Sequence, residues 1–332
     1  MRAFITASFD PAARARLARL MEVVHEDWRE RHHIYFDGAA FGRRITEVGA
    51  DVLLVEADMV GADVLEACAL RLIGCCRGEP VNVDVGAATR RGIPVVHAPG
   101  RNADAVADLT LAFILTWCRH LHEIEAYYRG EARPIEAAGD FLALYNRFTG
   151  RELGGLTIGL IGLGAVGREV AARATAFKAR VLAYDPYLTS LPPGVEAAGL
   201  DDLLRTADVV SLHAAVTTET QGLLSRQRLA SMKAGALLVN TARAALTDED
   251  ALYDALRSGH LGGAALDVVA AEPLQPGNRF LALPNVIVTP HVGGATVDVV
   301  RHHSEQIVDS IERHFRGERP RGIANPSIYE RR

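Results

Sequence analysis

Short apolar segments alternate with helical patterns along the first hundred residues. The apolar segments are RAFITAS, DVLLVEA, RLIGCC and IPVVHA, and a helix is predicted to begin at Pro11. Strands that alternate with helices indicate βαβ units, whose strands are parallel and buried on both faces. We therefore expect residues 1–102 to form a doubly wound parallel sheet.

A longer helical pattern follows Asn102. Asp104 can cap the segment AVADLTLAFILTWCRHLHEIEAYY, which is about 25 residues long and ends at Gly130. This helix is expected to connect two lobes. Residues 131–150 have no clear hydrophobic period, and we expect an irregular arm there.

The alternation of strands and helices begins again at Leu156. Its apolar segments are LTIGLIG, RVLAYDP, DVVSLHA, GALLVNTA, LGGAALDVV and NVIVTPH. A final amphipathic helix begins near residue 297 with VDVVRHHSEQIVDSIERHF, and we expect it to return to the first lobe. The expected architecture is α/β with two doubly wound parallel-sheet lobes, one built from residues 1–102 and 299–332 and the other from the inserted residues 103–298.

Length and charge narrow the choice of function. A chain of 332 residues is long enough for about two domains. Its net charge of −5 supplies no basic surplus for nucleic acid or an anionic membrane. The sequence begins without a basic leader, and no window approaches about 18 uninterrupted apolar residues, so we expect a cytoplasmic protein without a membrane segment.

The cysteines give no sign of a disulfide framework or a metal centre. They form no CxxC pair and no Cys/His group with zinc spacing. We expect buried thiols in a reducing cytoplasm, and no metal site, for all four: Cys68, Cys75, Cys76 and Cys118.

A glycine-rich motif, Gly162-Leu-Gly164-Ala-Val-Gly167, lies between the apolar strand LTIGLI and the helix REVAARATAF. The first glycine allows a tight turn, the second lets the backbone approach a pyrophosphate, and the third permits close packing of the helix. The free N–H groups at the start of the helix can bind the phosphate charge. This placement predicts a dinucleotide site, although a glycine-rich turn without a ligand would have the same spacing.

Asp185 supports the dinucleotide interpretation. It ends the next apolar segment, RVLAY, 18 residues beyond Gly167, where a carboxylate can accept hydrogen bonds from the adenosine ribose hydroxyls. The same carboxylate would repel a 2′-phosphate, and Pro186-Tyr187-Leu188 offers no basic side chain to receive one. We therefore expect NAD as the cofactor in preference to NADP.

Three polar side chains follow later strands of the same lobe. Arg243 comes after GALLVNTA, Glu272 after AALDVVAA and His291 after NVIVTP. The carboxyl ends of parallel strands open on the crevice that binds the cofactor. An Arg can bind a carboxylate and a carbonyl oxygen, a His can exchange the hydroxyl proton, and a Glu can orient the His and favour its protonated form.

Each of these side chains also has a structural interpretation when it is taken alone. Arg243 could be a solvated loop residue, Glu272 could cap the turn before Pro273, and His291 could be a satisfied loop residue after Pro290. Their joint placement after successive strands favours catalysis, and the set fits the reversible oxidation of a hydroxy acid.

With these motifs the chain resembles the D-isomer-specific 2-hydroxyacid dehydrogenases over nearly its whole length. The resemblance rests on GLGAVG with Asp185, on LLVNTARAA around Arg243, on AALDVVAAEP around Glu272 and on TPHVGGAT around His291. It implies a flavodoxin-like N-terminal substrate lobe, an inserted NAD-binding Rossmann lobe, a homodimer built mostly through the Rossmann lobes, and hydride exchange between NAD(H) and a 2-hydroxy or 2-keto acid. It further implies that Asp267 holds the nicotinamide carboxamide, that Thr241 and Ala242 lie beside the nicotinamide, and that Ala165 and Val166 present N–H groups to the pyrophosphate.

The sequence departs from typical relatives in the loop expected to bind the substrate carboxylate. Typical relatives have a glycine-rich loop there, whereas this chain has Cys75-Cys76-Arg77-Gly78-Glu79-Pro80-Val81-Asn82. Gly78 and Glu79 can still offer N–H groups, but Pro80 cannot. Arg77 changes the charge at the site, or alternatively points to solvent or pairs with Glu79. Three smaller departures alter fit and not chemistry: Ala165, Ala215 and Ala244.

We expect an NAD-dependent D-2-hydroxyacid dehydrogenase that ends without the regulatory domain of some phosphoglycerate dehydrogenases. Arg77, together with Arg101 and Arg147 in segments that could border the same cleft, favours a longer polar 2-keto acid over pyruvate or glyoxylate. Two alternatives remain at this stage. One is a formate- or phosphite-oxidising enzyme of the same fold, and the other is an NAD-sensing scaffold of the C-terminal-binding-protein kind.

Overall fold

The computed structural model describes residues 1–130 and 132–330, and in it the chain divides into two compact units. Unit 1 contains Met1–Asn102 and the segment from Thr296 onward, and unit 2 contains Ala103–Ala295. The first residue of the predicted arm, and the last two residues of the chain, lie outside the described residues.

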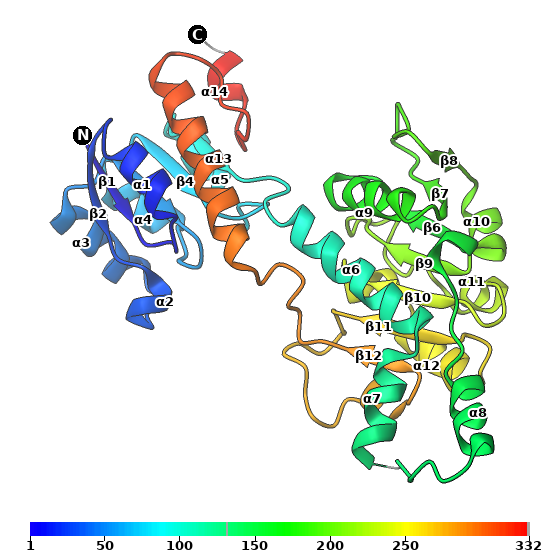
Figure 1. Ribbon diagram of the computed structural model, residues 1–332. Coiled ribbons are helices and arrows are strands. Elements are labelled where there is room, and N and C mark those ends of the chain that lie inside the picture. Colours follow the sequence, from blue (N-terminus) through cyan, green and yellow to red (C-terminus); the bar gives the residue numbers. More distant parts are fainter. Residues whose placement is uncertain (131, 331–332) are drawn as a thin grey trace. The chain divides into compact units, whose positions relative to one another are not determined.

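Unit 1 is a five-stranded parallel sheet with helices on both faces (Figure 1). The strands, in the sheet order β2-β1-β3-β4-β5, are β2 (Glu22–His25), β1 (Arg2–Ile5), β3 (Val52–Val55), β4 (Leu72–Cys75) and β5 (Val95–His97). One face packs against α3 (Gly38–Val48), α4 (Ala62–Ala67) and α5 (Val85–Arg90). The other face packs against α1 (Pro11–Leu17) and the last long helix, α13 (Val297–Phe315). Two short helices complete the unit: α2 (Trp28–Arg31) and α14 (Ser327–Glu330).

Unit 2 is a seven-stranded parallel sheet in the order β12-β11-β10-β9-β6-β7-β8. Its strands are β6 (Thr157–Ile161), β7 (Arg180–Tyr184), β8 (Val195–Ala197), β9 (Val209–Leu212), β10 (Leu237–Asn240), β11 (Gly263–Leu266) and β12 (Val286–Val288). Chain order reverses between β6 and β9, the position at which doubly wound sheets bind ligands. The predicted fold class, two parallel doubly wound lobes, is confirmed.

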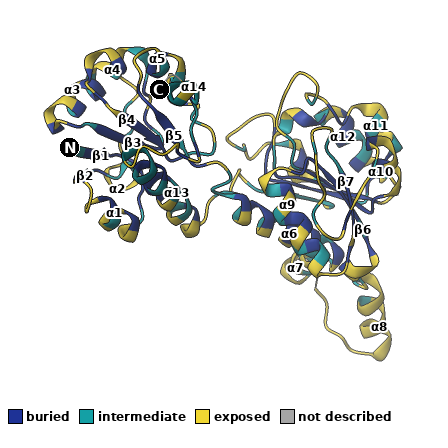
Figure 2. Ribbon diagram, turned by 90° about the horizontal axis from the view of Figure 1, so that it is seen from above, coloured by how far each residue is buried: buried dark blue, intermediate teal, exposed yellow. Residues whose placement is uncertain are grey.

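Helices cover both faces of this second sheet. One face packs against α6 (Ala103–Cys118) and α9 (Ala165–Ala176), and the other against α10 (Leu200–Thr206), α11 (Arg226–Ser231) and α12 (Glu249–Arg257). Figure 2 shows the strands buried between these layers. Three 3₁₀ turns link the elements: η1 (Leu153–Gly155), η2 (Ala244–Leu246) and η3 (Arg279–Ala282).

The prediction of a single connecting helix is wrong. The segment forms two helices, α6 and α7 (Leu121–Gly130), because His120 adopts a left-handed conformation with φ of 53°. The His120 ring nitrogen Nδ1 then lies 3.1 Å from Glu123 Oε1 in the first turn of α7. No glycine or proline marks this break, so the apolar pattern runs through it.

The predicted irregular arm is also wrong for residues 138–147, which form helix α8 (Ala138–Arg147). Asp140 accepts hydrogen bonds from the N–H groups of Glu136 and Ala137 at 3.1 and 2.9 Å, and so fixes the start of the helix. Neither α7 nor α8 buries a single residue.

All four cysteines are buried and free. Among the described residues, no helix combines the length and the apolar character that a membrane crossing requires. The same residues contain no group of three or more His, Cys, Asp or Glu side chains arranged to hold a metal ion.

Candidate active site

The glycine-rich turn of unit 2 has the backbone geometry that its sequence predicts. Gly162 follows β6 with φ of 92°, and a Cβ there would lie 2.6 Å from the Ala214 nitrogen. A Cβ on Gly167 would lie 2.2 Å from the Gly162 oxygen, so a side chain would push the helix away from the turn. A Cβ on Gly164 would meet nothing within 4 Å, which leaves open space beside the turn. The first and third glycines are therefore required by contact, and the second keeps one side open.

Helix α9 begins at this turn and offers unpaired donors. The capping residue before the helix, Gly164, has no side chain to cap it. Within the described residues, the N–H groups of Ala165, Val166 and Gly167 donate to no protein acceptor. Such a helix end attracts anions through its N–H groups and its dipole. The turn therefore fits the pyrophosphate of a dinucleotide.

Asp185 lies at the end of β7, the strand next to β6. Its Oδ2 accepts from the Leu163 N–H at 2.9 Å, and its Oδ1 accepts from the Tyr187 N–H at 3.0 Å. A carboxylate oxygen has more than one acceptor position, so the group can still receive a ribose hydroxyl. Asp185 thus also fixes the glycine-rich turn to its neighbouring strand, which the spacing alone did not reveal.

His213 is a polar residue beside the same turn that the sequence analysis missed. It follows β9, and its Cβ lies 3.6 Å from the position that a Gly167 Cβ would take. Burial lowers its pKa to about 4, so the imidazole is neutral near pH 7. Its Nε2 lies 2.9 Å from Ser211 Oγ, and its Nδ1 is buried with no partner in the described residues. The order Ser-Leu-His at a strand end is the only local signal for it.

His291 and Glu272 form a direct pair. The Nδ1 atom of His291 lies 2.8 Å from Glu272 Oε2, and the two side chains are 46% and 37% exposed. They line a hollow of about 300 Å³ together with Pro273, Leu274 and Pro290. With Nδ1 facing the carboxylate, Nε2 is the ring atom left to exchange a proton with a ligand.

Asp267 fixes the turn that carries His291. Its Oδ1 accepts from Thr289 Oγ1 at 2.6 Å and from the Val292 N–H at 2.8 Å, and its Oδ2 accepts from the Gly293 N–H at 2.8 Å. The Asp267 main-chain oxygen accepts the His291 N–H at 2.9 Å, and His291 has φ of 58°. Asp267 is 1% exposed, so these bonds hold His291 in a left-handed turn against a buried anchor. The sequence indicated no such anchoring role.

Arg243 lies in a turn that Asn240 closes. Asn240 Nδ2 donates to the Arg243 main-chain oxygen at 3.0 Å, and Asn240 Oδ1 accepts from the Ala242 N–H at 3.1 Å. The Arg243 side chain is exposed, and its Nη1 donates to the neighbouring Ala242 oxygen at 2.6 Å. Thr241 is buried beside this turn, with its Oγ1 3.1 Å from Thr110 Oγ1. The turn beneath the exposed guanidinium is thus fixed by Asn240.

The three predicted catalytic residues come from neighbouring strands. Arg243, Glu272 and His291 follow β10, β11 and β12, which are adjacent in the sheet. A second hollow, of about 540 Å³, is lined by Arg243 and also by Glu272. Glu272 therefore lines both hollows, one with His291 and the other with Arg243. Arg243, Glu272 and His291 share one edge of the sheet with the dinucleotide turn.

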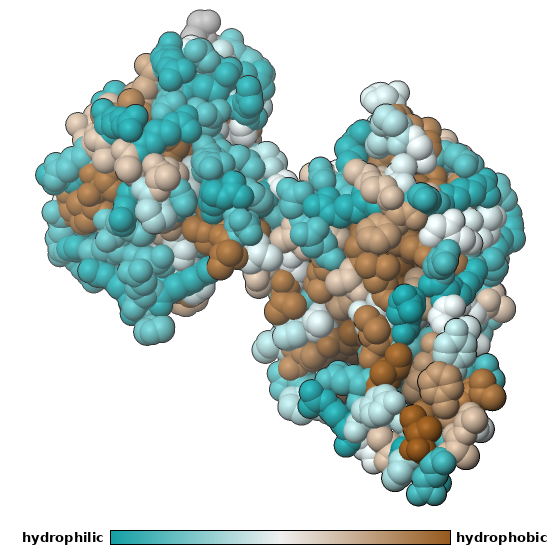
Figure 3. Space-filling view, in the orientation of Figure 1, coloured by the Kyte–Doolittle hydropathy of each residue, from teal (hydrophilic) through white to brown (hydrophobic). Residues whose placement is uncertain are grey.

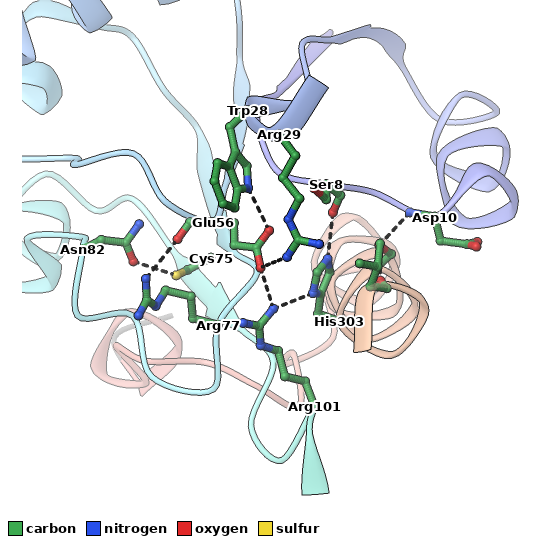
Figure 4. Close-up of polar contacts among 12 residues, drawn as sticks. Ser8, Asp10, Trp28, Arg29, Glu56, Cys75, Arg77, Asn82, Arg101 and His303 are labelled. Carbon is green, nitrogen blue, oxygen red and sulfur yellow. Dashed lines mark hydrogen bonds and ion pairs between the residues drawn. The ribbon is translucent and has the colours of Figure 1, made fainter. Parts of the chain in front are cut away.

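The predicted substrate loop, with Arg77, Gly78 and Glu79, lies in unit 1 after β4. Arg77 neither extends freely into solvent nor pairs with Glu79, since its Nη1 donates to the Glu56 main-chain oxygen at 3.4 Å (Figure 4). Glu79 is exposed, and the Gly78 oxygen lies 2.7 Å from His97 Nδ1. The alternative in which Arg77 pairs with Glu79 is therefore wrong.

The other two arginines have internal contacts. Arg101 is bound to Glu56 and His303 within unit 1. Arg147, on α8 in unit 2, lies over the rings of Tyr127 and Phe148 at 5.0 and 5.1 Å. Their sequence positions alone suggested neither set of contacts.

Comparison with known proteins gives one family. Residues 111–293 match the family described as "D-isomer specific 2-hydroxyacid dehydrogenase, NAD binding domain". The Bacillus subtilis protein YoaD, named as a candidate 2-hydroxyacid dehydrogenase, is 36% identical over 326 residues, which cover 97% of this chain and 93% of that protein. A D-3-phosphoglycerate dehydrogenase of Mycobacterium leprae is 40% identical over 274 residues, which cover 81% of this chain but only 50% of the relative.

A solved structure agrees with these matches. The TT0316 protein of Thermus thermophilus is 38% identical and has a TM-score of 0.80, covering 98% of this chain and 100% of that one. The glycine turn, the open helix end and the family match together establish NAD as the cofactor. The chain therefore belongs to the D-isomer-specific 2-hydroxyacid dehydrogenases, which makes it an NAD-dependent oxidoreductase of D-2-hydroxy acids.

Proposed function

We propose that His291 is the acid–base group in the interconversion of a D-2-hydroxy acid and its 2-keto acid. The observation that carries this proposal is the 2.8 Å contact between His291 Nδ1 and Glu272 Oε2, at the sheet edge that also holds the dinucleotide turn. NAD, when bound, supplies the hydride acceptor for oxidation and, as NADH, the hydride donor for reduction. His291 Nε2 takes the hydroxyl proton in oxidation and returns it in reduction. Glu272 binds Nδ1 and so orients the ring, which leaves Nε2 for the ligand.

Arg243 completes this set as the group that binds the acid. Its exposed guanidinium can bind a carboxylate through two parallel hydrogen bonds and can polarise the keto oxygen. Lysine would keep the charge and lose this geometry. Asn240 fixes the turn beneath the guanidinium, so that Arg243 binds from a defined base.

The remaining cofactor contacts belong to the same proposal. The N–H groups of Ala165 and Val166 bind the pyrophosphate, and Asp185 binds the ribose diol. Thr241, Ala242 and Asp267 lie beside the nicotinamide, and Asp267 also anchors the His291 turn. Residues 103–298 then form the NAD-binding domain. Residues 1–102 with 299–332 form the substrate-binding domain, in which the N–H groups of Gly78 and Glu79 bind the substrate carboxylate.

The test is NADH oxidation with a panel of 2-keto acids, in the unaltered protein and in His291→Gln. Turnover of at least one keto acid, lost in His291→Gln while NADH still binds with unchanged affinity, supports the proposal. Oxidation of formate or phosphite with no keto acid reduced would favour the dehydrogenases that exchange no hydroxyl proton. NADH binding without turnover of any of these substrates would favour an NAD-sensing scaffold.

We also propose a homodimer that forms through α7 and α8. Neither helix buries a residue, and apolar side chains gather over α8 in Figure 3. Six apolar side chains of this region are each at least half exposed: Leu121, Tyr128, Ile135, Phe141, Leu142 and Tyr145. Exposed apolar side chains in this number are typical of a subunit interface. Sedimentation analysis should give a dimer that Leu142→Glu converts to a monomer, whereas a monomeric unaltered protein would refute this interface.

The free, buried cysteines are consistent with a reducing compartment. We propose a cytoplasmic location on that basis.

A further inference from the structure

The segment that carries Glu272 is weakly held by its own main chain. It follows β11 in unit 2, and the N–H of Asp267 still donates to the oxygen of the neighbouring strand β10 at 3.0 Å. Within the described part of the chain, the main-chain groups of residues 268–272 form no hydrogen bond with another main-chain group. The first two of these residues are buried valines, and the last three are exposed. The exposed part therefore depends on side chains to fix its position.

Glu249 supplies such a contact from a different element. Its Oε1 accepts from the Ala270 N–H at 2.7 Å. The preceding N–H, of Val269, donates to Glu272 Oε1 at 3.4 Å. The other oxygen of Glu272, Oε2, lies 2.8 Å from His291 Nδ1. Two consecutive N–H groups of the segment thus donate to two carboxylates, and Glu249 is the one that lies outside the segment.

The main chain of Glu249 is itself well fixed. Glu249 is the first residue of α12, and the residue before it, Asp248, caps the helix by accepting the Ala251 N–H at 3.0 Å. The Asp248 N–H donates to the Leu224 oxygen at 3.0 Å, and α12 packs buried side chains into the core of unit 2. The helix dipole also favours a carboxylate in the first turn. Glu249 can therefore act as a rigid point of attachment for the exposed segment.

Glu249 also belongs to the stretch of chain that carries Arg243. Residues 244–248, which include η2, connect the two. Arg243, Glu249 and Glu272 line the same hollow of about 540 Å³. The 2.7 Å bond from Ala270 to Glu249 therefore joins the stretch that holds the guanidinium to the segment that holds Glu272, entirely within unit 2.

We propose that Glu249 is a positioning residue of the reaction, which holds the exposed segment through Ala270 so that Glu272 meets His291 Nδ1. The proposal rests on the proposed function, because Glu249 acts through Glu272 and exchanges no proton itself. Without this acceptor the exposed segment moves more freely, and the Glu272 carboxylate no longer fixes the orientation of the imidazole.

The first test compares two substitutions of Glu249 in steady-state reduction of the best keto acid. Glu249→Ala should lower kcat by about tenfold or more, because misplaced catalytic groups slow the chemical step. KM for the keto acid should stay the same, since Asn240 fixes the Arg243 turn independently. Glu249→Gln keeps an oxygen that accepts the Ala270 N–H and should retain kcat within about twofold. The control Asp250→Ala removes the same charge from the next, exposed residue of α12 and should keep kcat.

A double-mutant cycle separates positioning from a general structural role. Glu272→Ala should lower kcat, and Glu249→Ala added to it should lower kcat no further, because Glu249 acts only through Glu272. A role in stability alone would instead lower kcat by the same factor in both backgrounds.

Hydrogen exchange of the peptide that covers residues 268–274 tests the contact without the reaction. Exchange should be at least about threefold faster in Glu249→Ala than in the unaltered protein and should stay slow in Glu249→Gln. Unchanged exchange or unchanged kcat in Glu249→Ala, or an equal loss with and without Glu272, would overturn the inference, while keto-acid reduction that depends on His291 still supports the proposed function. Failure to reduce any keto acid would overturn both.

Discussion

Each of the two sheets has a glutamate bound by a basic side chain after one of its strands, Glu56 by Arg101 in unit 1 and Glu272 by His291 in unit 2. The two pairs differ in how far they are exposed to solvent. Glu56 in unit 1 is 6% exposed and is bound by Arg101, which a neutral His303 supports. Glu272 in unit 2 binds His291 directly, and both side chains are more than a third exposed. Burial removes the first group from exchange with ligands, whereas exposure leaves the second able to transfer a proton. The comparison indicates that solvent access, and not residue type, separates a structural carboxylate from a functional one.

Removal of the exposed imidazole should have the largest effect on rate. His291→Ala should lower kcat by about 10²–10⁴, because no other group would take the hydroxyl proton. Steady-state kinetics with the best keto acid measure this loss. A melting temperature within a few degrees of that of the unaltered protein would show that the fold is intact. Near-normal turnover in His291→Ala would exclude it from proton transfer.

Disruption of the buried pair should affect stability instead. Arg101→Met leaves the Glu56 carboxylate buried, with Arg29 at 3.8 Å as its nearest remaining cation. We expect a loss of about 3–5 kcal/mol in the free energy of unfolding, measured with urea, and a partial recovery in the double variant with Glu56→Gln. Glu272→Gln at the exposed pair is the matched control and should cost less than about 1 kcal/mol. Similar losses at both sites would contradict the distinction drawn from burial.

Removal of the Asp185 carboxylate should have a smaller effect, on the preference for NAD over NADP. Asp185→Ser removes the repulsion of a 2′-phosphate, so the preference of the unaltered protein for NAD over NADP, expected to exceed tenfold or about 1.4 kcal/mol, should shrink. The ratio of kcat/KM for the two cofactors measures it. Equal use of both cofactors by the unaltered protein would reject the role of Asp185.

The buried histidines predict a gradual loss of stability in mild acid. Burial lowers the pKa of His213 to about 4 and lowers the pKa of His303. The unfolded chain binds these protons near pH 6.5, so the stabilisation is complete above that pH and falls below it, by at most about 1.4 kcal/mol per pH unit for each histidine. Urea unfolding between pH 7.5 and 5 should show a shallower fall in His213→Gln than in the unaltered protein. The exposed control His32→Asn should keep the full slope.

The sequence could predict the strands, the helices between them and the polar residues that follow the strands, because short-range patterns determine these features. The strands alternate with helices as expected, and Arg243, Glu272 and His291 follow adjacent strands because apolar runs mark where each strand ends. The glycine turn could be predicted because the fold leaves no space for a Cβ at Gly162 or Gly167, so that the sequence must have glycine at both positions.

Contacts between distant segments could not be predicted in this way. The partners of Arg101, Glu56 and His303, lie 45 and 202 residues away in the chain. The left-handed His120 ends a helix without a glycine, and α8 packs no side chain into the core. The contacts of Arg101 are tertiary. The conformation of His120 is local, but a histidine in the sequence does not predict it.

The central claim, that His291 in the exposed pair with Glu272 transfers the proton, is tested most directly by the pH dependence of kcat/KM in the unaltered protein and in His291→Gln. Reduction needs the protonated imidazole and oxidation the neutral one, so in the unaltered protein reduction should slow and oxidation should quicken as pH rises. The residual activity of His291→Gln should lose this pH dependence, because the glutamine side chain does not exchange a proton in this range. The same pH dependence in His291→Gln, in a variant that still folds and binds NADH, would contradict the account.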